Sequence, residues 1–337
     1  MTITRRNVLQ LGIGLAAGSA FASFPGLASA ASLNWDMSDE YGGNAQTGIV
    51  AKFFIAELSK RIGDELEITY HGSKSLGFSS ADHFDAVQFG AVPIAVSQTS
   101  VLGGVEPFFD LTSLPFLAKD LAEARTLWGV SKPEFSRIFD ANNMVVLYAQ
   151  PNAPSGIYAK KPIDSIEALK GLRIRTYDAN GTRTFAAAGA APLQVAFSDL
   201  IPQLSTGGID AVLTSAEGGI QLSAWDYLSD FTALNYAMAL FMVHANEDSY
   251  NELSDGAKAA IEEVSAITED FAWKLVTDSI EESYETARSH KMMVTDTPPQ
   301  EAFEHLQQAG ADLHTAWLEK VGERGAEVLA AFNAAKS

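Results

Sequence analysis

Segments with the apolar spacing of a helix alternate along this chain with short segments that have the pattern of a strand. Residues 33–37 form the first strand pattern, and a helical segment with one apolar face follows it. That face comprises Ile49, Val50, Phe53, Phe54, Leu58 and Ile62. A second strand pattern at 66–70 and the apolar run 92–96 enclose a further helix. This is the order of βαβ units in a parallel sheet, so we expect an α/β fold.

A cluster of turn-forming residues divides the chain near its middle. Residues 150–156, Gln-Pro-Asn-Ala-Pro-Ser-Gly, follow a strand pattern at 144–148 and indicate a crossover into a second α/β unit. In this second unit, Asp164 and Glu167 fit a helix capping box. The length of the chain, 337 residues, suits about two ordinary domains after removal of a leader.

One long helix is expected late in the chain. Residues 257–294 contain neither proline nor glycine, and apolar residues recur there at near-helical spacing. A helix of this length would lie across two domains and tie them together. A coiled coil with a partner helix is the alternative.

The first thirty residues have the pattern of a secretory signal peptide. Arg5 and Arg6 precede an apolar stretch at 8–22, and the Ala-Ser-Ala run at 28–30 is typical of a cleavage site. We therefore expect export to the periplasm and cleavage after residue 30. Sec and twin-arginine export both stay open, because the arginine pair also fits the latter signal. An uncleaved anchor is the alternative, but the apolar stretch is short and interrupted.

Composition argues against several classes of function. The absence of cysteine excludes disulfides, a lipid anchor on cysteine, thiolate metal ligands and a cysteine nucleophile. The formal net charge of −19 comes from dispersed carboxylates, which argues against nucleic-acid binding and is also compatible with a saline habitat. The six histidines lack the spacing of a zinc hydrolase, and no nucleotide-binding or serine-hydrolase motif is present. We therefore expect no catalytic residue, no metal and no cofactor.

The segment 169–176, Leu-Lys-Gly-Leu-Arg-Ile-Arg-Thr, resembles the most diagnostic motif of the solute-binding proteins of TRAP transporters, which are secondary transporters with a periplasmic receptor. Other matching segments follow the family order over essentially the whole mature chain. They are Ser75-Leu76-Gly77, Leu114-Pro115-Phe116-Leu117, Lys161-Pro162-Ile163, Thr206-Gly207-Gly208-Ile209-Asp210-Ala211 and Leu253-Ser254-Asp255.

The resemblance implies the α/β fold of a two-domain, type II-like periplasmic binding protein, with hinge strands and a long helix spanning both domains. We expect domain 1 to comprise residues 31–151 and 246–285, and domain 2 to comprise residues 152–245 and 286–337. The resemblance also implies a receptor that performs no catalysis and delivers a small solute to sodium-driven TRAP membrane subunits in a transient complex. We expect a monomer. A receptor for an ATP-driven importer and a secreted enzyme are the alternatives.

Arg175 matches the arginine that clamps the carboxylate of the ligand in this family. A guanidinium suits this role, because its planar fork donates two parallel hydrogen bonds and stays charged when water is excluded. Arg173 and Arg175 lie on the same side of the expected strand, so we expect one of them to face solvent. A surface salt bridge is the alternative role for Arg175.

The chain departs from the family pattern at two places. Ser155 stands where many members carry a second basic residue, and Thr214 aligns with an asparagine that often contacts solute. Both departures favour a small solute with few anionic groups, such as a hydroxy or keto acid. Glu217 could instead receive an ammonium or hydroxyl group, so an amino alcohol such as ethanolamine is an alternative solute. A helix cap is the alternative role for Glu217.

Further solute contacts are expected near strand ends and in loops, where open α/β sheets present ligand contacts. The candidates are Trp35, Tyr41, Gln98, Phe116, Asn152 and Tyr236. Packing in the core is the alternative role for the aromatic residues among them.

Overall fold

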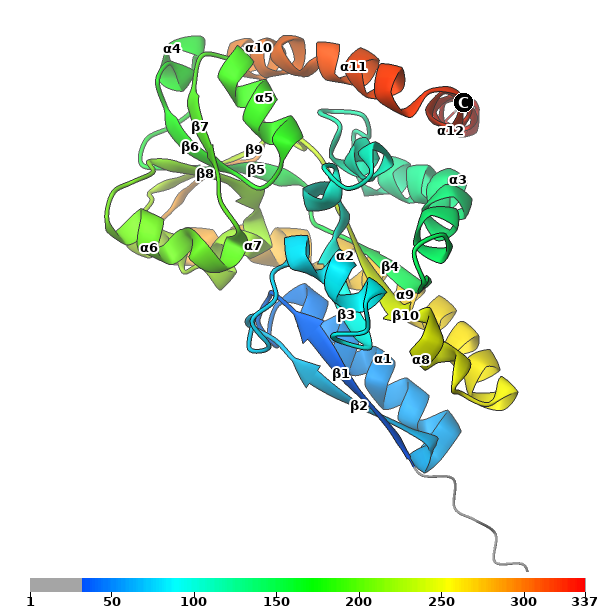
Figure 1. The fold of residues 1–337 in the computed structure, drawn as a ribbon. Helices are drawn as coiled ribbons and strands as arrows, with labels where there is room; N and C mark the ends of the chain where they lie inside the picture. The colour runs from blue at the N-terminus through cyan, green and yellow to red at the C-terminus, as the bar shows by residue number, and fades with distance from the viewer. Residues whose placement is uncertain (1–31, 337) are drawn as a thin grey trace, which may run out of the picture. The chain divides into compact units, whose positions relative to one another are not determined.

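Two β-sheets organise residues 32–336, the part of the chain that this computed structural model describes. The expected signal peptide at residues 1–30 lies outside the described residues. Among the described helices, none is both long enough and apolar enough to cross a membrane. Helices and strands alternate over most of the chain, as the apolar patterns predict, and both sheets mix parallel and antiparallel strands (Figure 1).

The first sheet has the strand order β2-β1-β3-β10-β4. Its strands are β1 (Leu33–Asp39), β2 (Leu66–His71), β3 (Ile94–Gln98), β4 (Met144–Pro151) and β10 (Leu240–Asn246). Strand β1 pairs in parallel with β2 and β3, whereas β10 runs antiparallel to β3 and β4. The helices before β10 that belong to this half are α1 (Gln46–Ile62), α2 (Ser80–Gln88) and α3 (Leu121–Asp140).

Both faces of the first sheet are buried, which explains the unbroken apolar runs in β3 and β10. Ile94 and Val96 belong to the cluster that packs under α1, while Ala95 between them belongs to the cluster under α2 and α3. Val243 and Met242 divide between the two clusters in the same way. Burial on two faces therefore positions the ends of these strands firmly.

The second sheet has the strand order β11-β9-β5-β8-β6-β7. Its strands are β5 (Ser155–Ala159), β6 (Arg173–Thr176), β7 (Ala191–Gln194), β8 (Ala211–Ser215), β9 (Asp230–Ala233) and β11 (Met293–Thr295). Strand β6 is parallel to β7 and β8, and β5 is antiparallel to β8 and β9. Its helices are α4 (Ile166–Leu169), α5 (Ala179–Ala187), α6 (Leu200–Ser205) and α7 (Ala216–Gln221).

Short 3₁₀ segments and the C-terminal helices complete the chain. The 3₁₀ segments are η1 (Gly63–Glu65), η2 (Thr99–Leu102), η3 (Pro107–Ser113), η4 (Phe197–Asp199) and η5 (Ala224–Asp226). The remaining helices are α8 (Glu247–Asn251), α9 (Asp255–Ser289), α10 (Gln300–Gly310), α11 (Asp312–Val321) and α12 (Glu323–Ala335).

The expected long helix is present as α9, although it ends five residues earlier than the sequence pattern predicts. Ser254 caps it, because its hydroxyl accepts a hydrogen bond from the backbone N–H of Ala257. The residues after Ser289 leave the helix and enter β11. Helix α9 contacts α1 and β4 of the first half and α7 and β11 of the second.

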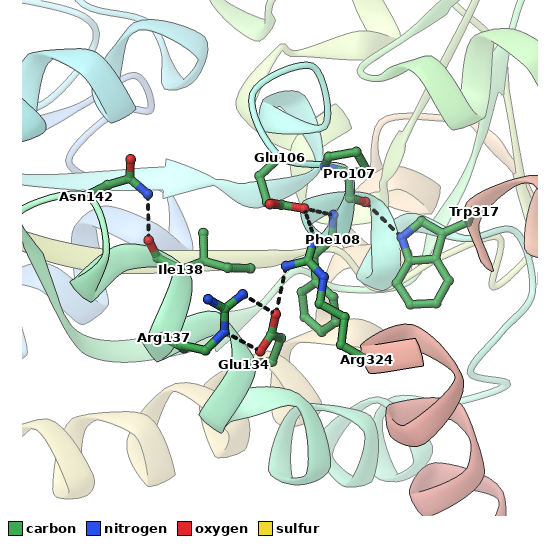
Figure 2. A network of polar contacts seen from close by, with 9 residues as sticks. All are labelled: Glu106, Pro107, Phe108, Glu134, Arg137, Ile138, Asn142, Trp317 and Arg324. Carbon is green, nitrogen blue, oxygen red and sulfur yellow. Dashed lines mark hydrogen bonds and ion pairs between the residues drawn. The ribbon is translucent and has the colours of Figure 1, made fainter. Parts of the chain in front are cut away.

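The C-terminal helices return from the second sheet to the first (Figure 1). Helix α10 packs against α5, and α12 packs against α3. Figure 2 shows the polar contacts that hold this end: Arg324 of α12 bonds to Glu134 of α3 (2.7 Å) and to Glu106, and the Trp317 indole donates to the carbonyl of Pro107 (2.8 Å).

Two segments do not follow the domain boundaries expected from the sequence. Strand β10, most of which was assigned to domain 2, pairs with β3 and β4 of the first sheet. Helix α12, also assigned to domain 2, packs on α3. Strand pairing places β10 and helix packing places α12, and in both cases the partners lie far away in the sequence. The division of the chain into two domains stays a prediction.

Candidate functional site

A cavity with an empty volume of about 430 Å³ is lined by residues from both sheets. The first sheet contributes Gln98 from β3, Gln150 from β4 and Phe241 from β10. The second contributes Arg175 from β6 and Thr214 from β8. Most of these residues lie at or near the carboxyl ends of their strands, where α/β sheets present ligand contacts.

Strand register places three first-sheet residues in one row. Phe241 is paired with Gln98 on one side and with Gln150 on the other. Directly paired residues project from the same face of a sheet, so these three side chains share the face that lines the cavity. The same face carries the apolar core under α1 further along the strands. The row of Gln98, Phe241 and Gln150 therefore lies at the edge of this apolar core.

Arg175 is a buried cation of the cavity wall, with 2% of its surface exposed. Its Nε donates to the carbonyl of Val195 (2.8 Å), and its Nη1 donates to the carbonyl of Leu213 (3.2 Å). Its guanidinium carbon lies 5.9 Å from the centroid of the Tyr177 ring. Burial lowers the pKa of Arg175, because the charged form loses its hydration.

No ion pair of Arg175 occurs within residues 32–336. Arg173, two residues earlier, is exposed and binds the carboxylate of Asp210 through Nε (2.6 Å) and Nη2 (2.8 Å). The expectation that one of the two arginines faces solvent is therefore confirmed, and that residue is Arg173. The alternative of a surface salt bridge fits Arg173 and is wrong for Arg175.

Glu217 also lines the cavity, from the first turn of α7. Its Oε1 accepts a long hydrogen bond (3.4 Å) from the backbone N–H of Gln46. Burial raises the pKa of Glu217 to about 7. The helix is capped by Ser215, whose hydroxyl accepts from the N–H of Gly218 (3.1 Å). The capping role considered for Glu217 therefore belongs to Ser215.

Tyr41 connects polar and aromatic parts of the wall. Its hydroxyl donates to Oε1 of Gln98 (2.9 Å), and Nε2 of Gln98 donates to the hydroxyl of Ser100 (3.2 Å). The Tyr41 ring centroid lies 4.7 Å from that of Phe197 and 5.1 Å from that of Phe241. Both amide atoms of Gln98 thus bond to protein groups, and the three rings form an apolar surface beside it.

The support for Tyr41 comes from a buried carboxyl at the end of β1. Asp39 Oδ1 accepts from the backbone N–H of Tyr41 (2.9 Å), and Oδ2 accepts from the hydroxyl of Tyr70 (2.8 Å). Burial raises the pKa of Asp39 to about 7 despite these hydrogen bonds. Asp39 is not among the residues that line the cavity, so it positions Tyr41 from behind.

Gln150 differs from Gln98 in having no polar partner. It is 1% exposed, and neither its amide nitrogen nor its amide oxygen forms a hydrogen bond within the described part of the chain. A buried primary amide without partners costs free energy, about 1 to 3 kcal/mol for each unsatisfied group. Such a group on a cavity wall is suited to a polar solute.

A second hollow of about 630 Å³ adjoins the cavity and shares part of its wall. The shared residues are Tyr41, Gln98, Arg175, Tyr177 and Phe197. Glu40 lines only this outer hollow. Its Oε2 accepts from the N–H of Ser80 at the start of α2 (2.9 Å), and its Oε1 accepts from the N–H of Ser198 in η4 (3.1 Å). One carboxylate thus joins segments that follow different sheets.

Six of the nine candidates from the sequence line the cavity. They are Tyr41, Gln98, Asn152, Arg175, Thr214 and Glu217. The sequence analysis did not identify Gln46, Gln150, Phe197 or Phe241. Gln150 stands in the turn-forming cluster and offered only the signal of a strand end, while Phe197 lies in a 3₁₀ segment without periodicity.

The other three candidates do not reach the cavity. Trp35 lies four residues before the carboxyl end of β1 and packs in the core under α1. Phe116 and Tyr236 stack edge to face on each other at 5.4 Å, and the Tyr236 hydroxyl lies 3.1 Å from that of Thr184. Trp35 and Tyr236 are buried packing residues, whereas Phe116 is half-buried and lines a different hollow.

Comparison with known proteins identifies similar receptors. Residues 37–320 match the model of a family described as bacterial extracellular solute-binding protein, family 7. The chain is 28% identical over 166 residues to the 2,3-diketo-L-gulonate-binding periplasmic protein YiaO of Escherichia coli, which covers 48% of this chain and 50% of that protein. The chain thus spans about half the length of this relative. It is 24% identical over 247 residues to the sialic acid-binding periplasmic protein SiaP of Vibrio cholerae, covering 70% and 75% of the two chains.

Two solved structures have the same fold and moderate sequence identity. DctP7, an extracytoplasmic solute receptor of Bordetella pertussis that binds pyroglutamic acid, is 30% identical with a TM-score of 0.87, covering 90% of this chain and 100% of DctP7. A marine metagenome TRAP solute-binding protein specific for pyroglutamate is 27% identical with a TM-score of 0.86, covering 90% and 99%. The α/β fold expected from the sequence is confirmed by this similarity.

Proposed function

Because this chain belongs to family 7 of the bacterial extracellular solute-binding proteins, which are the periplasmic receptors of TRAP transporters, we propose that it captures a small organic monocarboxylate in the cavity that Arg175 lines. The receptor then delivers this solute to sodium-driven membrane subunits. The family consists of solute receptors and not of enzymes. Membership therefore argues against the alternatives of a secreted enzyme and an ATP-driven importer.

The unpaired charge of Arg175 carries the proposal. An arginine has five N–H donors, and two of them bond to the carbonyls of Val195 and Leu213, which leaves three without a partner among residues 32–336. Carbonyl dipoles compensate a buried charge only in part, and a buried cation without an anion is costly. A carboxylate of the solute would supply the missing charge and accept two parallel hydrogen bonds.

The size and charge of the cavity favour a small solute with one negative charge. The space of about 430 Å³ between the cavity walls, part of which is open to solvent, has room for a compact solute. Ser155 stands where many members of the family have a second basic residue. Pyroglutamate, the ligand of both similar solved structures, is a cyclic acid with one carboxylate and fits these limits. A hydroxy or keto acid fits them as well.

Glu217 supports a second candidate class of solute. Its carboxyl lines the same cavity, and at neutral pH a carboxyl with a pKa of about 7 is partly ionised. An ionised Glu217 would attract the ammonium group of a zwitterion or of an amino alcohol such as ethanolamine. This second class predicts that binding depends on Glu217 more than on Arg175.

We also propose that the receptor closes around its solute as two lobes, in the periplasm and as a monomer. The crossings between the two sheets include the segment from β4 to β5 and the segment from β9 to β10. A ligand shifts such an equilibrium only through its different affinity for the open and closed states. A solute held by both sheets has that property.

The test is ligand binding by an arginine variant with a matched control. We expect Arg175→Ala to stay folded without solute and to lose the thermal stabilisation that pyroglutamate, lactate or pyruvate gives to the wild type. Saturation at 100 times the Kd stabilises a receptor by about 2.7 kcal/mol, so the loss is measurable. Arg173→Ala, which removes an exposed arginine of the same strand, should bind as the wild type does. Undiminished carboxylate binding by Arg175→Ala would contradict the proposal.

A further inference from the structure

The cavity has two polar regions, which different sheets contribute. Arg175 projects from the second sheet, and the row of Gln98, Phe241 and Gln150 projects from the first. The rings of Tyr41, Phe197 and Phe241 contribute an apolar surface to the same cavity. A solute that fits this wall has an anionic end, a compact carbon body and a second polar feature on the side of the first sheet.

Gln150 defines what that second feature has to be. Its side chain offers one N–H₂ donor group and one carbonyl acceptor side by side, and both are buried without a partner in the described part of the chain. A lone carbonyl of a solute would satisfy only the nitrogen, and a lone amine would satisfy only the oxygen. A cis amide, as in a lactam ring, presents a donor and an acceptor along one edge and can satisfy both through two parallel hydrogen bonds.

The neighbouring glutamine does not compete for this role. Gln98 uses its oxygen for the Tyr41 hydroxyl and its nitrogen for the Ser100 hydroxyl. Glu217 differs from Gln150, because its Oε1 already accepts a hydrogen bond from the N–H of Gln46 (3.4 Å) and its ionised form has no donor. Gln46, the third glutamine of the cavity wall, donates from its Nε2 to the hydroxyl of Ser279 (2.6 Å). Gln150 is thus the cavity glutamine with neither amide atom bonded within residues 32–336.

We infer that Gln150 determines specificity by pairing with the amide edge of the solute, so that this receptor selects carboxylates that also carry a lactam or a similar cis amide. The inference rests on the proposed function, because it assumes that Arg175 holds the carboxylate. The inference adds that Gln150 distinguishes a lactam acid from ring acids of the same size. This discrimination comes from the first sheet, whereas Arg175 belongs to the second.

Three ring acids of similar size test this pairing. Pyroglutamate has both the N–H and the ring carbonyl, 5-oxotetrahydrofuran-2-carboxylate keeps the carbonyl but lacks the N–H, and cyclopentanecarboxylate lacks both. Leaving a buried donor or acceptor unpaired weakens binding by roughly 10- to 100-fold. We therefore expect calorimetry on the wild-type receptor to show an affinity for pyroglutamate at least tenfold higher than for the lactone, and still lower affinity for cyclopentanecarboxylate.

The variant Gln150→Leu removes the amide at nearly constant volume. We expect it to reduce the preference for pyroglutamate over cyclopentanecarboxylate by roughly 10- to 100-fold. Without solute, its melting temperature should equal or exceed that of the wild type, because a buried amide without partners is replaced by an apolar side chain. Gln150→Met provides a second apolar variant should leucine fit poorly. Gln88→Leu, at a glutamine of α2 that does not line the cavity, is the control and should keep the wild-type preference.

The outcomes separate this inference from the proposed function. If all three acids bind the wild type equally well and Arg175→Ala abolishes their binding, the receptor function holds and the pairing with Gln150 is wrong. The same conclusion follows if Gln150→Leu keeps the full preference for pyroglutamate. If neither these acids nor lactate or pyruvate binds the wild type, both the proposed function and the inference fall. If only lactate or pyruvate binds, the inference alone falls.

Discussion

At Glu217, burial and charge act against each other on the wall of the cavity. Burial raises the pKa of this carboxyl to about 7, while the N–H of Gln46 stabilises its ionised form only weakly at 3.4 Å. A carboxylate solute stays anionic throughout the neutral range. An ionised Glu217 therefore repels an anionic solute and attracts a cationic one. Protonation makes Glu217 neutral and removes both effects.

The affinity for pyroglutamate should rise as the pH falls from 8 to 6. Protonation of Glu217 removes a negative charge from the cavity, and two like charges several ångströms apart in a protein repel by about 1 to 3 kcal/mol. We expect an increase of the order of tenfold in the wild type and a much smaller change in Glu217→Gln, measured by calorimetry at pH 6, 7 and 8. Asp39 titrates in the same range in both proteins, so the difference between them isolates Glu217. An affinity for pyroglutamate that falls toward pH 6 only when Glu217 is present would instead mean that the ionised carboxylate accepts a hydrogen bond from the solute.

Single residues of the site differ in how well the sequence predicts them. Arg175 follows from a motif with a known role, and strand alternation explains why it shares a side with Arg173. Gln150 could not be identified in this way, because it begins a run of turn-forming residues and its lack of partners is a property of the folded chain. Trp35 was misplaced because an aromatic residue in a strand gives no sign of its distance from the strand end.

At the scale of elements, helix α7 sits so close to β5 that only glycine fits between them. A Cβ at Gly219 would lie 2.1 Å from Cζ of Tyr158. That ring is fixed, since its hydroxyl donates to the carbonyl of Ala216 (2.8 Å) and its face packs on Phe231 with centroids 4.5 Å apart. The close approach positions the first turn of α7, and with it Glu217.

Gly219→Ala should therefore destabilise the receptor. Forcing a methyl group into a packed interface costs about 1 to 3 kcal/mol, and we expect a loss of this size in urea unfolding without solute. Gly129→Ala is the matched control, because that glycine lies in α3 with no heavy atom within 4 Å of an added Cβ. Alanine at this helix position should raise stability by up to about 1 kcal/mol. Equal stability of the two variants would show that α7 can move away from β5 freely.

Elements with strong periodicity were predictable, and their ends were less so. The expected strand that carries Arg173 and Arg175 is present as β6, and helix α3 continues without interruption to residue 140. Pro133 lies inside that helix, but burial of Phe135 and Phe139 in the core outweighs its effect on the backbone. The cap expected at Asp164 is Ser165, whose hydroxyl accepts from the N–H of Ala168 (3.4 Å).

At the scale of the whole described chain, a few contacts at the rim of the cavity join the two sheets. Glu40 bonds to the N–H groups of both Ser80 and Ser198, and the side chain of Gln221 donates to the carbonyl of Asn44 (3.3 Å). These groups belong to segments that follow different sheets. Rim contacts of this kind favour the closed arrangement, so they contribute to the apparent affinity for a solute they do not touch.

Glu40→Gln should weaken solute binding without changing the preference among solutes. A neutral amide oxygen accepts hydrogen bonds less strongly than a carboxylate, and one amide oxygen cannot replace both oxygens of Glu40. We expect a decrease in affinity of roughly three- to tenfold, the same for pyroglutamate and cyclopentanecarboxylate. Glu67→Gln, at an exposed position of β2, should have no effect. A changed ratio between the two acids would mean that Glu40 contacts solute directly.

Helix α9 has a mechanical consequence for any such closing motion. Its 35 residues form a rod about 52 Å long that is attached to α1 and β4 at one part and to α7 and β11 at another. Beyond Gly256 the rod has no glycine or proline at which to flex. Rotation of one sheet against the other must then bend the rod elastically or make it slip along its neighbours. In the proposed closing motion, the stiffness of this helix, which does not line the cavity, would therefore limit how far the two sheets separate.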